Sequence, residues 1–299
     1  MGLFKKKDNV TKFSLPIEVI DEHTFENRDI TSLDLSNCKK LRTIASGAFR
    51  NHEELTEIRF PESLEEIGEG AFEHCEMIKQ IDLSHCKKLR EIGEKAFAYC
   101  KRLSEVRLPE NIEEIGESAF EYCEMIKQID LSHCKKLREI GNSAFWSCND
   151  LKKIDLSLCK NLQEIYYGTF FCCDNLSGVR FPENIEEIGT WAFARCDGLK
   201  KIDLSHCKKL RVIGKQAFVL CKKLSEISLP ENIEEIGEGA FEDCKMIKQI
   251  DLSHCKKLHT IGKGAFNTPT LSEVLLPECY SVETGVNTFG KGCKIIKKS

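Results

Sequence analysis

The sequence predicts an α/β repeat solenoid in which about twelve turns stack on one another. A literal repeat is the first observation behind this class. The stretch CEMIKQIDLSHCKKLREIG fills residues 75–93, recurs letter for letter at 123–141, and has a near copy at 244–262. The second observation is a marker phenylalanine that returns every 23 to 25 residues, at Phe25, Phe49, Phe72, Phe97, Phe120, Phe145, Phe170, Phe193, Phe218, Phe241, Phe266 and Phe289. One such turn cannot bury its apolar residues alone, so stacked turns are expected to share one core.

Each turn carries an apolar L-x-x-I-x-L pattern with further apolar positions behind it, such as Leu103, Val106, Leu108, Ile112, Ile115, Ala119 and Phe120. This period and pattern lie in the leucine-rich-repeat range and predict an arc with a parallel β-sheet on its concave face. Two kinds of turn mostly alternate. One reads LPENIEEIG, as at 108–116, and the other reads DLSHCKKLREIG, as at 82–93, giving a super-repeat of 48 residues.

The combination IGxxAFxxC, at residues 92–100 and 115–123, resembles the BspA-like, or Treponema-type, leucine-rich-repeat family. The resemblance extends from about Phe13 to Phe289. It implies a relation to bacterial and protist surface proteins that adhere to host or matrix proteins. This sequence departs from that pattern because no signal peptide or anchor is visible in it.

The chain ends suggest a basic N-terminal tail at 1–12, a single solenoid domain at 13–290 whose end turns act as caps, and a basic C-terminal tail at 291–299. No apolar h-region follows Met1, so a cytoplasmic protein is expected if this start is natural; a cell-surface or secreted protein is the alternative. Gly2 raises the possibility of N-myristoylation, but Lys6 occupies the position at which that motif has Ser or Thr. No stretch is apolar enough to span a membrane. The net charge of -4 and the pI near 6.1 argue against nucleic acid as a partner.

Of the 17 cysteines, 14 occupy two repeated positions, one after the marker phenylalanine and one after a Leu-Ser pair, which favours buried thiols over disulfides or zinc. Eight of them lie three residues after a marker phenylalanine: Cys75, Cys100, Cys123, Cys148, Cys173, Cys196, Cys221 and Cys244. Adjacent His–Cys pairs such as His85–Cys86 recur only every second turn, too far apart to share a metal. No catalytic constellation and no phosphate-binding glycine motif stand out. We therefore expect no enzyme activity, metal or cofactor.

A column of charged residues follows the predicted strands, and its sign mostly alternates. This charge ladder consists of Asp34, Arg59, Asp82, Arg107, Asp130, Asp155, Arg180, Asp203 and Asp251, interrupted by Ser228. Opposite charges on adjacent strands can pair across a sheet and hold its register. A neighbouring column of like-charged glutamates, from Glu66 to Glu235, faces lysine pairs on alternate turns. The alternatives are a neutralised, solvated surface and an ionic docking stripe.

The repeat is irregular between Asp130 and Lys201, where two serine-type turns follow each other. Aromatic residues gather in and beside this region: Trp146, Tyr166, Tyr167, Phe171 and Trp191. They form either an exposed binding hot spot or a packing repair at the irregular turn. The sequence thus predicts a non-enzymatic protein-binding scaffold with a partner of unknown identity. A surface adhesin for host or matrix proteins is the alternative.

Overall fold

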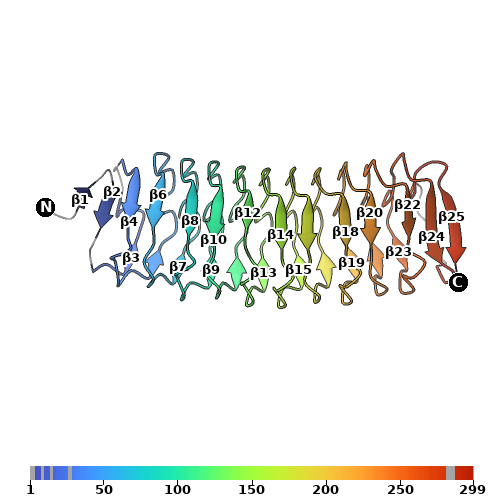
Figure 1. The fold of residues 1–299 in the computed structure, drawn as a ribbon, viewed down its shortest axis with the longest axis horizontal. Helices are drawn as coiled ribbons and strands as arrows, with labels where there is room; N and C mark the ends of the chain where they lie inside the picture. The colour runs from blue at the N-terminus through green and yellow to red at the C-terminus, as the bar shows by residue number, and fades with distance from the viewer. Residues whose placement is uncertain (1–3, 8–9, 14–15, 26–28, 281–286, 299) are drawn as a thin grey trace. The chain divides into compact units, whose positions relative to one another are not determined.

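The computed structural model describes residues 4–7, 10–13, 16–25, 29–280 and 287–298. The chain divides into two compact units, Met1–Leu151 (unit 1) and Lys152–Ser299 (unit 2). Both are parallel-strand β-solenoids, with about 11 turns in total (Figure 1). Most turns contribute a first strand, usually of three residues, and a second strand of two residues, so two separate ladders of strands run through each unit.

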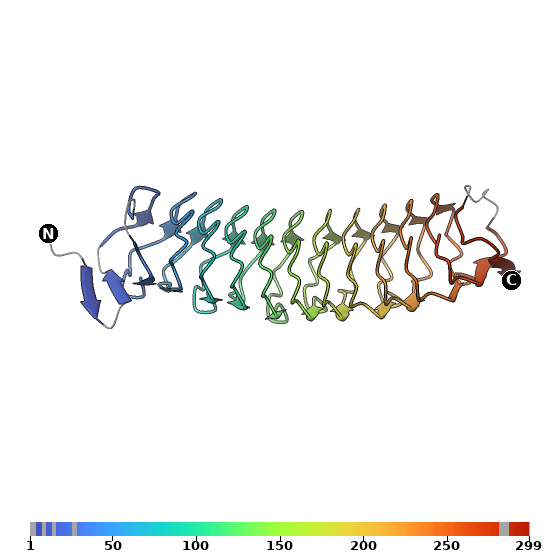
Figure 2. The ribbon, with the colours of Figure 1, turned by 90° about the horizontal axis from the view of Figure 1, so that it is seen from above.

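The longer strands of unit 1 are β4 (Ser32–Asp34), β6 (Glu57–Arg59), β8 (Gln80–Asp82), β10 (Glu105–Arg107) and β12 (Gln128–Ile129). They form the sheets β1-β2-β4-β6 and β8-β10-β12. An antiparallel hairpin of β1 (Phe4–Lys7) and β2 (Val10–Phe13) adds to the parallel strands at the N-terminal end (Figure 2). The short strands β3 (Val19–Ile20), β5 (Thr43–Ile44), β7 (Glu66–Ile67), β9 (Glu91–Ile92), β11 (Glu114–Ile115) and β13 (Glu139–Ile140) form one parallel sheet.

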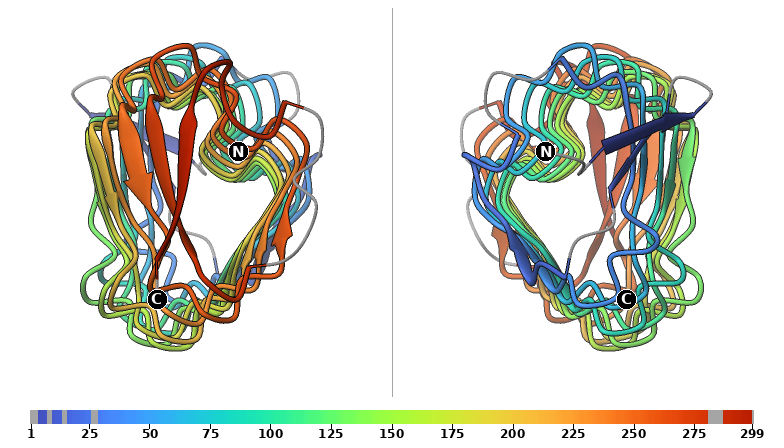
Figure 3. Two further views of the ribbon diagram at one scale, coloured as in Figure 1. Left: turned by 90° about the vertical axis from the view of Figure 1, so that its right-hand side faces the viewer. Right: turned by 90° about the vertical axis from the view of Figure 1, so that its left-hand side faces the viewer.

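Unit 2 repeats this arrangement. Its longer strands are β14 (Lys153–Asp155), β16 (Gly178–Arg180), β18 (Lys201–Asp203), β20 (Glu226–Ser228), β22 (Gln249–Asp251), β24 (Glu273–Pro277) and β25 (Lys294–Lys298). They form the sheets β14-β16, β18-β20 and β22-β24-β25. The short strands β15 (Glu164–Ile165), β17 (Glu187–Ile188), β19 (Val212–Ile213), β21 (Glu235–Ile236) and β23 (Thr260–Ile261) form a second sheet on the opposite side of the turns (Figure 3).

The marker phenylalanines stack face to face at the centre of each unit. In unit 1, the rings of Phe72 and Phe97 have centroids 5.2 Å apart and are tilted by 3°. In unit 2, Phe218 and Phe241 are 5.2 Å apart and tilted by 2°. The β-strand register places each apolar residue on its counterpart one turn away, as in Ile81 beside Val106. A repeat of nearly constant length therefore produces a continuous core, as predicted.

The expected helices are absent from the described residues, so the α/β class is not confirmed and this part of the chain is all-β. The reason lies in the backbone around each marker phenylalanine. Glu73 and Cys75 donate their N–H groups three residues back, to Gly70 and Phe72, whereas Phe72 and His74 donate to Ala96 and Ala98 of the next turn. An α-helix would direct all of these N–H groups back along its own chain. Alternate bonds to the next turn exclude it.

Positive φ angles make this alternation possible. They occur two residues before and two residues after the marker phenylalanine, for example at Gly70 (φ 55°) and His74 (φ 60°). The single concave sheet that we expected is likewise not confirmed, because two ladders of strands are present. The strands β1 and β25 fall within the segments 1–12 and 291–299, which we expected to be basic tails.

Candidate functional site

The cysteine column after the marker phenylalanines is buried, and its thiols bond to the backbone. The Sγ atom of Cys75 donates to the carbonyl of Phe49 at 3.0 Å, and that of Cys196 donates to Phe170 at 3.1 Å. The same bond recurs at Cys100, Cys123, Cys148, Cys221 and Cys244. All 17 cysteines are free thiols and 14 are buried. Their repeated role is to satisfy a buried carbonyl of the preceding turn.

The second cysteine column, which follows the Leu–Ser pattern, is also held as neutral thiol. Burial, with a contribution from Asp82 and then Glu62, raises the pKa of Cys86 to about 12. Burial and then Asp203 raise the pKa of Cys207 to about 12. A nucleophilic or metal-binding cysteine needs the opposite shift, toward thiolate. These thiols have the chemistry of core residues.

The histidines of the His–Cys pairs connect successive turns. Nε2 of His85 lies 2.9 Å from the carbonyl oxygen of Phe60, and Nε2 of His254 lies 2.9 Å from that of Leu229. A proton on Nε2 lets the imidazole donate this bond, as it also does in His133 and His206. Within the described ranges, no group of three or more His, Cys, Asp or Glu side chains could hold a metal ion.

The charge-ladder residues lie at or directly after the ends of the longer strands. Arg107 is in register with Asp82 at a nitrogen-to-oxygen distance of 3.7 Å, and Arg180 is in register with Asp155 at 3.4 Å. Arg59 is in register with Asp34, but Asp34 is buried, and the guanidinium of Arg59 pairs with Glu57. The ladder's role in binding stays a prediction.

The ladder aspartates have a second, local role that sequence analysis missed. Oδ1 of Asp130 accepts hydrogen bonds from the backbone N–H of Ser132 at 3.0 Å and from its hydroxyl at 2.6 Å. The same turn forms at Asp34, Asp82, Asp155, Asp203 and Asp251. The Ser132 bonds lower the pKa of the Asp130 carboxyl below its ordinary value. The Asp-Leu-Ser sequence was the available signal, because Asp commonly bonds the N–H two residues on.

The columns on the short-strand side are largely neutralised. Glu65 is the ion-pair partner of both Arg42 and Lys88, and Lys87 pairs with Glu110 at 3.0 Å. The glutamates of the short strands lie side by side, and burial followed by repulsion from Glu114 raises the pKa of Glu91. The neutralised surface describes unit 1 better than a continuous ionic stripe does.

Three of the five predicted aromatic residues form a surface cluster in unit 2, which we call the aromatic patch: Tyr167, Phe171 and Trp191. The ring of Trp191 lies 5.4 Å from that of Tyr167 and 5.8 Å from that of Phe171, tilted by 40° and 48°. Its indole N–H donates to Oε1 of Gln216 at 2.7 Å. Tyr167 is 42% exposed, while Phe171 and Trp191 are half-buried.

The other two predicted residues are placed differently. Tyr166 is half-buried, and its carbonyl accepts a hydrogen bond from the hydroxyl of Thr169 at 2.9 Å. Trp146 belongs to unit 1, where its side chain is half-buried and its carbonyl accepts the N–H of Tyr122. Binding through any of the five stays a prediction.

A second aromatic cluster was missed from the sequence. His74, Tyr99 and Tyr122, which we call the tyrosine stack, lie two residues after consecutive marker phenylalanines of unit 1. The centroid of Tyr99 is 4.5 Å from that of His74 and 4.9 Å from that of Tyr122, with tilts of 10° and 14°. Aligning the turns on the marker phenylalanine would have placed these rings in one column.

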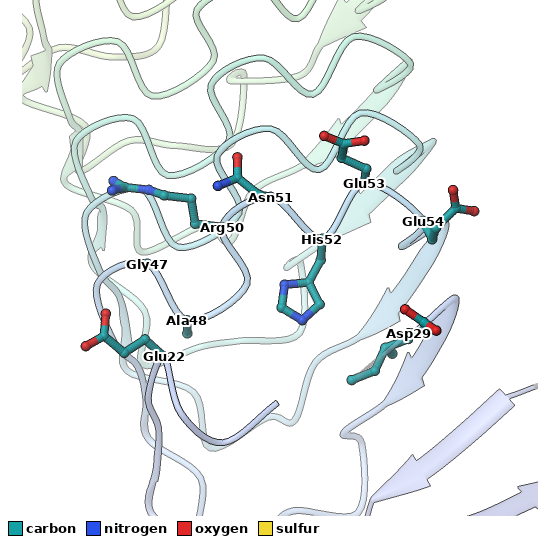
Figure 4. Close-up of a pocket in the computed structure, with 10 residues that line it drawn as sticks. Glu22, Asp29, Gly47, Ala48, Arg50, Asn51, His52, Glu53 and Glu54 are labelled. Carbon is teal, nitrogen blue, oxygen red and sulfur yellow. The ribbon is translucent and has the colours of Figure 1, made fainter. Parts of the chain in front are cut away.

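A shallow hollow of about 540 Å³ lies near the start of unit 1. Figure 4 shows Glu22, Asp29 and Glu54 around the ring of His52. Arg50 on its wall is already paired with Glu73, at 2.8 Å. The hollow mixes charged side chains, and its described lining residues place no nucleophile beside a base.

The structure bears on one of the two expectations about membranes. Among the residues that the structure describes, no helix is long and apolar enough to cross a bilayer. Gly2, the candidate lipidation residue, lies outside the described residues.

Comparison with known proteins supports the same fold. The pneumococcal vaccine antigen PcpA matches with a TM-score of 0.54 and 20% identity, over 89% of this chain and 68% of that one. A leucine-rich cell surface protein from Faecalibacterium prausnitzii matches with a TM-score of 0.47 and 18% identity, over 100% and 94% of the two chains. No curated protein matches the sequence.

The family profile described as BspA type leucine-rich repeat region (6 copies) matches residues 1–87, 85–200 and 198–298. These ranges include the marker phenylalanines, the cysteine columns and both kinds of turn. Solenoids of this kind are generally non-enzymatic scaffolds. The chain belongs to the BspA-type leucine-rich-repeat family.

Proposed function

We propose that the protein is a non-enzymatic protein-binding scaffold and that the aromatic patch of unit 2 is its anchor. The observation that carries this proposal is the convergence of three rings from two successive turns on the surface, with Tyr167 42% exposed. Tryptophan and tyrosine are enriched among residues that dominate binding energy. An extended repeat surface suits a protein partner better than a small molecule.

The backbone at Trp191 supports a role beyond packing. Trp191 has a φ of 57° at a position that is glycine in five other turns, whereas five more turns carry a smaller or flexible side chain there, also at positive φ: Lys95, Ser118, Ser143, Gln216 and Asn287. A bulky residue at positive φ is disfavoured by roughly 1 kcal/mol or more. Glycine would satisfy this turn without strain, so the indole is retained at a cost to stability. A role in binding would explain why a residue that destabilises this turn is kept.

The experiment compares Trp191→Gly with the wild-type protein in capture of a partner from the native source, followed by titration of that partner. Loss of an anchor should weaken binding by about 2 kcal/mol, close to thirtyfold. The melting temperature should stay constant or rise, because glycine relieves the positive φ. Lys95→Gly is the matched control, since Lys95 occupies the same position in unit 1 with a φ of 51°. Unchanged affinity in Trp191→Gly would refute the anchor.

We also propose a reducing compartment, such as the cytoplasm, as the site of action. The buried thiols support this, because an S–H group that donates to a carbonyl cannot also form a disulfide. A cell-surface adhesin is the second candidate, supported by the family itself. Protease treatment of intact cells, followed by detection with an antibody, distinguishes the two. Cleavage of the protein before the cells are lysed would favour a location on the cell surface.

A further inference from the structure

The tyrosine stack of unit 1 forms a surface column of rings held at strained backbone positions. His74, Tyr99 and Tyr122 have φ angles of 60°, 60° and 55° and are half-buried. The same position carries Asn51 in the turn before and Ser147 in the turn after, both also at positive φ. Small polar residues thus satisfy this backbone elsewhere in unit 1, and the rings need another explanation.

The stack ends with one ring face uncovered by another ring. Tyr99 covers one face of Tyr122 at a centroid distance of 4.9 Å. The next turn is adjacent, because the N–H of Tyr122 donates to the carbonyl of Trp146 at 2.8 Å. Its equivalent position holds the short side chain of Ser147. Among the described residues, no second ring stacks on Tyr122.

Carboxylates surround this column, and several lack a cationic partner. Glu73 pairs with Arg50, and Glu94 pairs with Lys95. Glu117 and Glu121, in the turn of Tyr122, have no Lys, Arg or His nitrogen within ion-pair distance among the described residues. After burial, Glu121 is the strongest influence that raises the pKa of Tyr99, so this carboxyl lies close to the stack. Burial raises the pKa of both Tyr99 and Glu121, and Lys95 acts to lower it, so one cation already lies near the stack, against the carboxylates of Glu73, Glu117 and Glu121. The carboxylates outnumber this cation, which favours a further one.

We propose that the open end of the tyrosine stack binds an arginine side chain from a basic segment of a partner protein. A guanidinium is flat and can continue the stack over Tyr122. Its N–H groups can donate to the carboxylates of Glu117 and Glu121. Lysine offers the charge without the flat surface, so arginine is preferred.

This surface is independent of the aromatic patch, which lies in unit 2 and has different chemistry. The probe is acetylated tetra-arginine amide, titrated calorimetrically into the full chain at low salt. Tyr122→Asn removes the ring and places a residue that the same backbone position accepts at Asn51. Glu121→Gln removes one charge and keeps the shape of the side chain. Leu220→Asn in unit 2 is the matched control, because Leu220 also lies two residues after a marker phenylalanine and has a φ of 61°.

We expect saturable binding of tetra-arginine that weakens about fivefold in Tyr122→Asn and about threefold in Glu121→Gln. Leu220→Asn should change the affinity less than about twofold, and tetra-lysine should bind about threefold more weakly than tetra-arginine. Two results would overturn the proposal. One is the absence of saturable binding at about 1 mM peptide. The other is wild-type affinity in Glu121→Gln, which decides the matter if Tyr122→Asn proves unstable.

Discussion

Units 1 and 2 have interiors that are packed in the same way, but their surfaces differ. The rings of Phe97 and Phe120 stack at 5.4 Å in unit 1, and those of Phe193 and Phe218 stack at 5.3 Å in unit 2. By contrast, unit 1 presents the tyrosine stack among carboxylates, and unit 2 presents the aromatic patch, in which Trp191 occupies a position that is glycine in several other turns. The two units thus repeat the same core behind chemically different exteriors.

This difference follows from how a solenoid packs. Every interior residue contacts its own counterpart one turn away, so a change in one turn disturbs two interfaces. Surface positions around the marker phenylalanine point away from the core and meet no such limit. We therefore assign both proposed binding surfaces to the few positions where the turns differ.

The largest expected effect tests whether the interior is equivalent in both units. A Cβ atom on Gly93 would lie 2.7 Å from the carbonyl carbon of Gly68, and one on Gly237 would lie 2.7 Å from that of Gly214. Backbone atoms cannot move aside as a side chain can, so Gly93→Ala and Gly237→Ala should each destabilise by about 3 kcal/mol. Chemical denaturation measures both.

Gly47→Ala is the control, since nothing lies within 4 Å of its added Cβ and only its φ of 65° opposes the change. We expect it to cost about 1 kcal/mol. Equal losses in all three variants would show that crowding between turns is not what requires glycine at position 93.

The interior of both units could be predicted from the sequence because the core residues recur at the same position of successive turns. Phe72, Cys75 and Ile81 recur with their neighbours at fixed spacing. The structure stacks Phe72 on Phe97, pairs Ile81 with Val106, and bonds the thiol of Cys100, the counterpart of Cys75, to the carbonyl of Phe72. That the described residues contain no helix could not be predicted in this way. It depends on positive φ at residues such as Lys95 and Ser118, which nothing in their chemistry indicates.

The candidate sites were only partly predictable. The irregular turns directed attention to Tyr167, Phe171 and Trp191, and these rings do meet. The tyrosine stack was not predicted from the sequence, because His74, Tyr99 and Tyr122 occur in regular turns and are of two residue types. Periodicity reveals what repeats, whereas unlike residues on neighbouring turns are recognised as neighbours only once the turns are aligned on the marker phenylalanine.

The second prediction concerns the buried thiols, which should behave alike in both units. Burial raises the pKa of Cys86 and Cys207 to about 12, above the ordinary thiol value of 9.0. The folded state therefore binds more protons than the unfolded state between these values. The contribution of these thiols to stability should be constant below about pH 9 and fall as pH rises toward 12.

Cys86→Ala and Cys207→Ala should each cost about 1 to 2 kcal/mol at neutral pH. Each should also make the alkaline loss of stability shallower than in the wild type. Urea denaturation at several pH values from 7 to 11 measures both effects. An identical alkaline slope in wild type and variants would assign the loss to tyrosines or lysines and not to these thiols.

The third prediction concerns the Asp–Ser turns, again one in each unit. Asp130→Ala and Asp251→Ala remove a carboxylate that accepts two hydrogen bonds, from Ser132 and Ser253, and each should cost about 1 kcal/mol. The folded pKa of both carboxyls is lowered, so their contribution is present above the unfolded value and is lost as pH falls through the folded value. The variants should lose less stability on acidification than the wild type. Asp130→Asn is the control, because its amide oxygen can accept the same bonds.

The smallest effect is expected from the charge ladder, where both units have one close cross-strand pair. Arg107 and Arg180 are largely exposed, with side-chain exposures of 60% and 78%, so solvent screens their attraction to Asp82 and Asp155. A double-mutant cycle of Asp82→Asn with Arg107→Gln should give a coupling of about 0.5 kcal/mol or less, and about 1 M salt should abolish it. The cycle is needed because Arg107 also pairs with Glu105 at 2.6 Å.

In unit 2, Ser228→Arg would place a cation in register with Asp203 and should stabilise by a similar few tenths of a kcal/mol. A coupling well above 1 kcal/mol would make the ladder a real determinant of register. A coupling near zero, combined with weaker partner capture by Arg107→Gln, would instead make it an ionic docking surface.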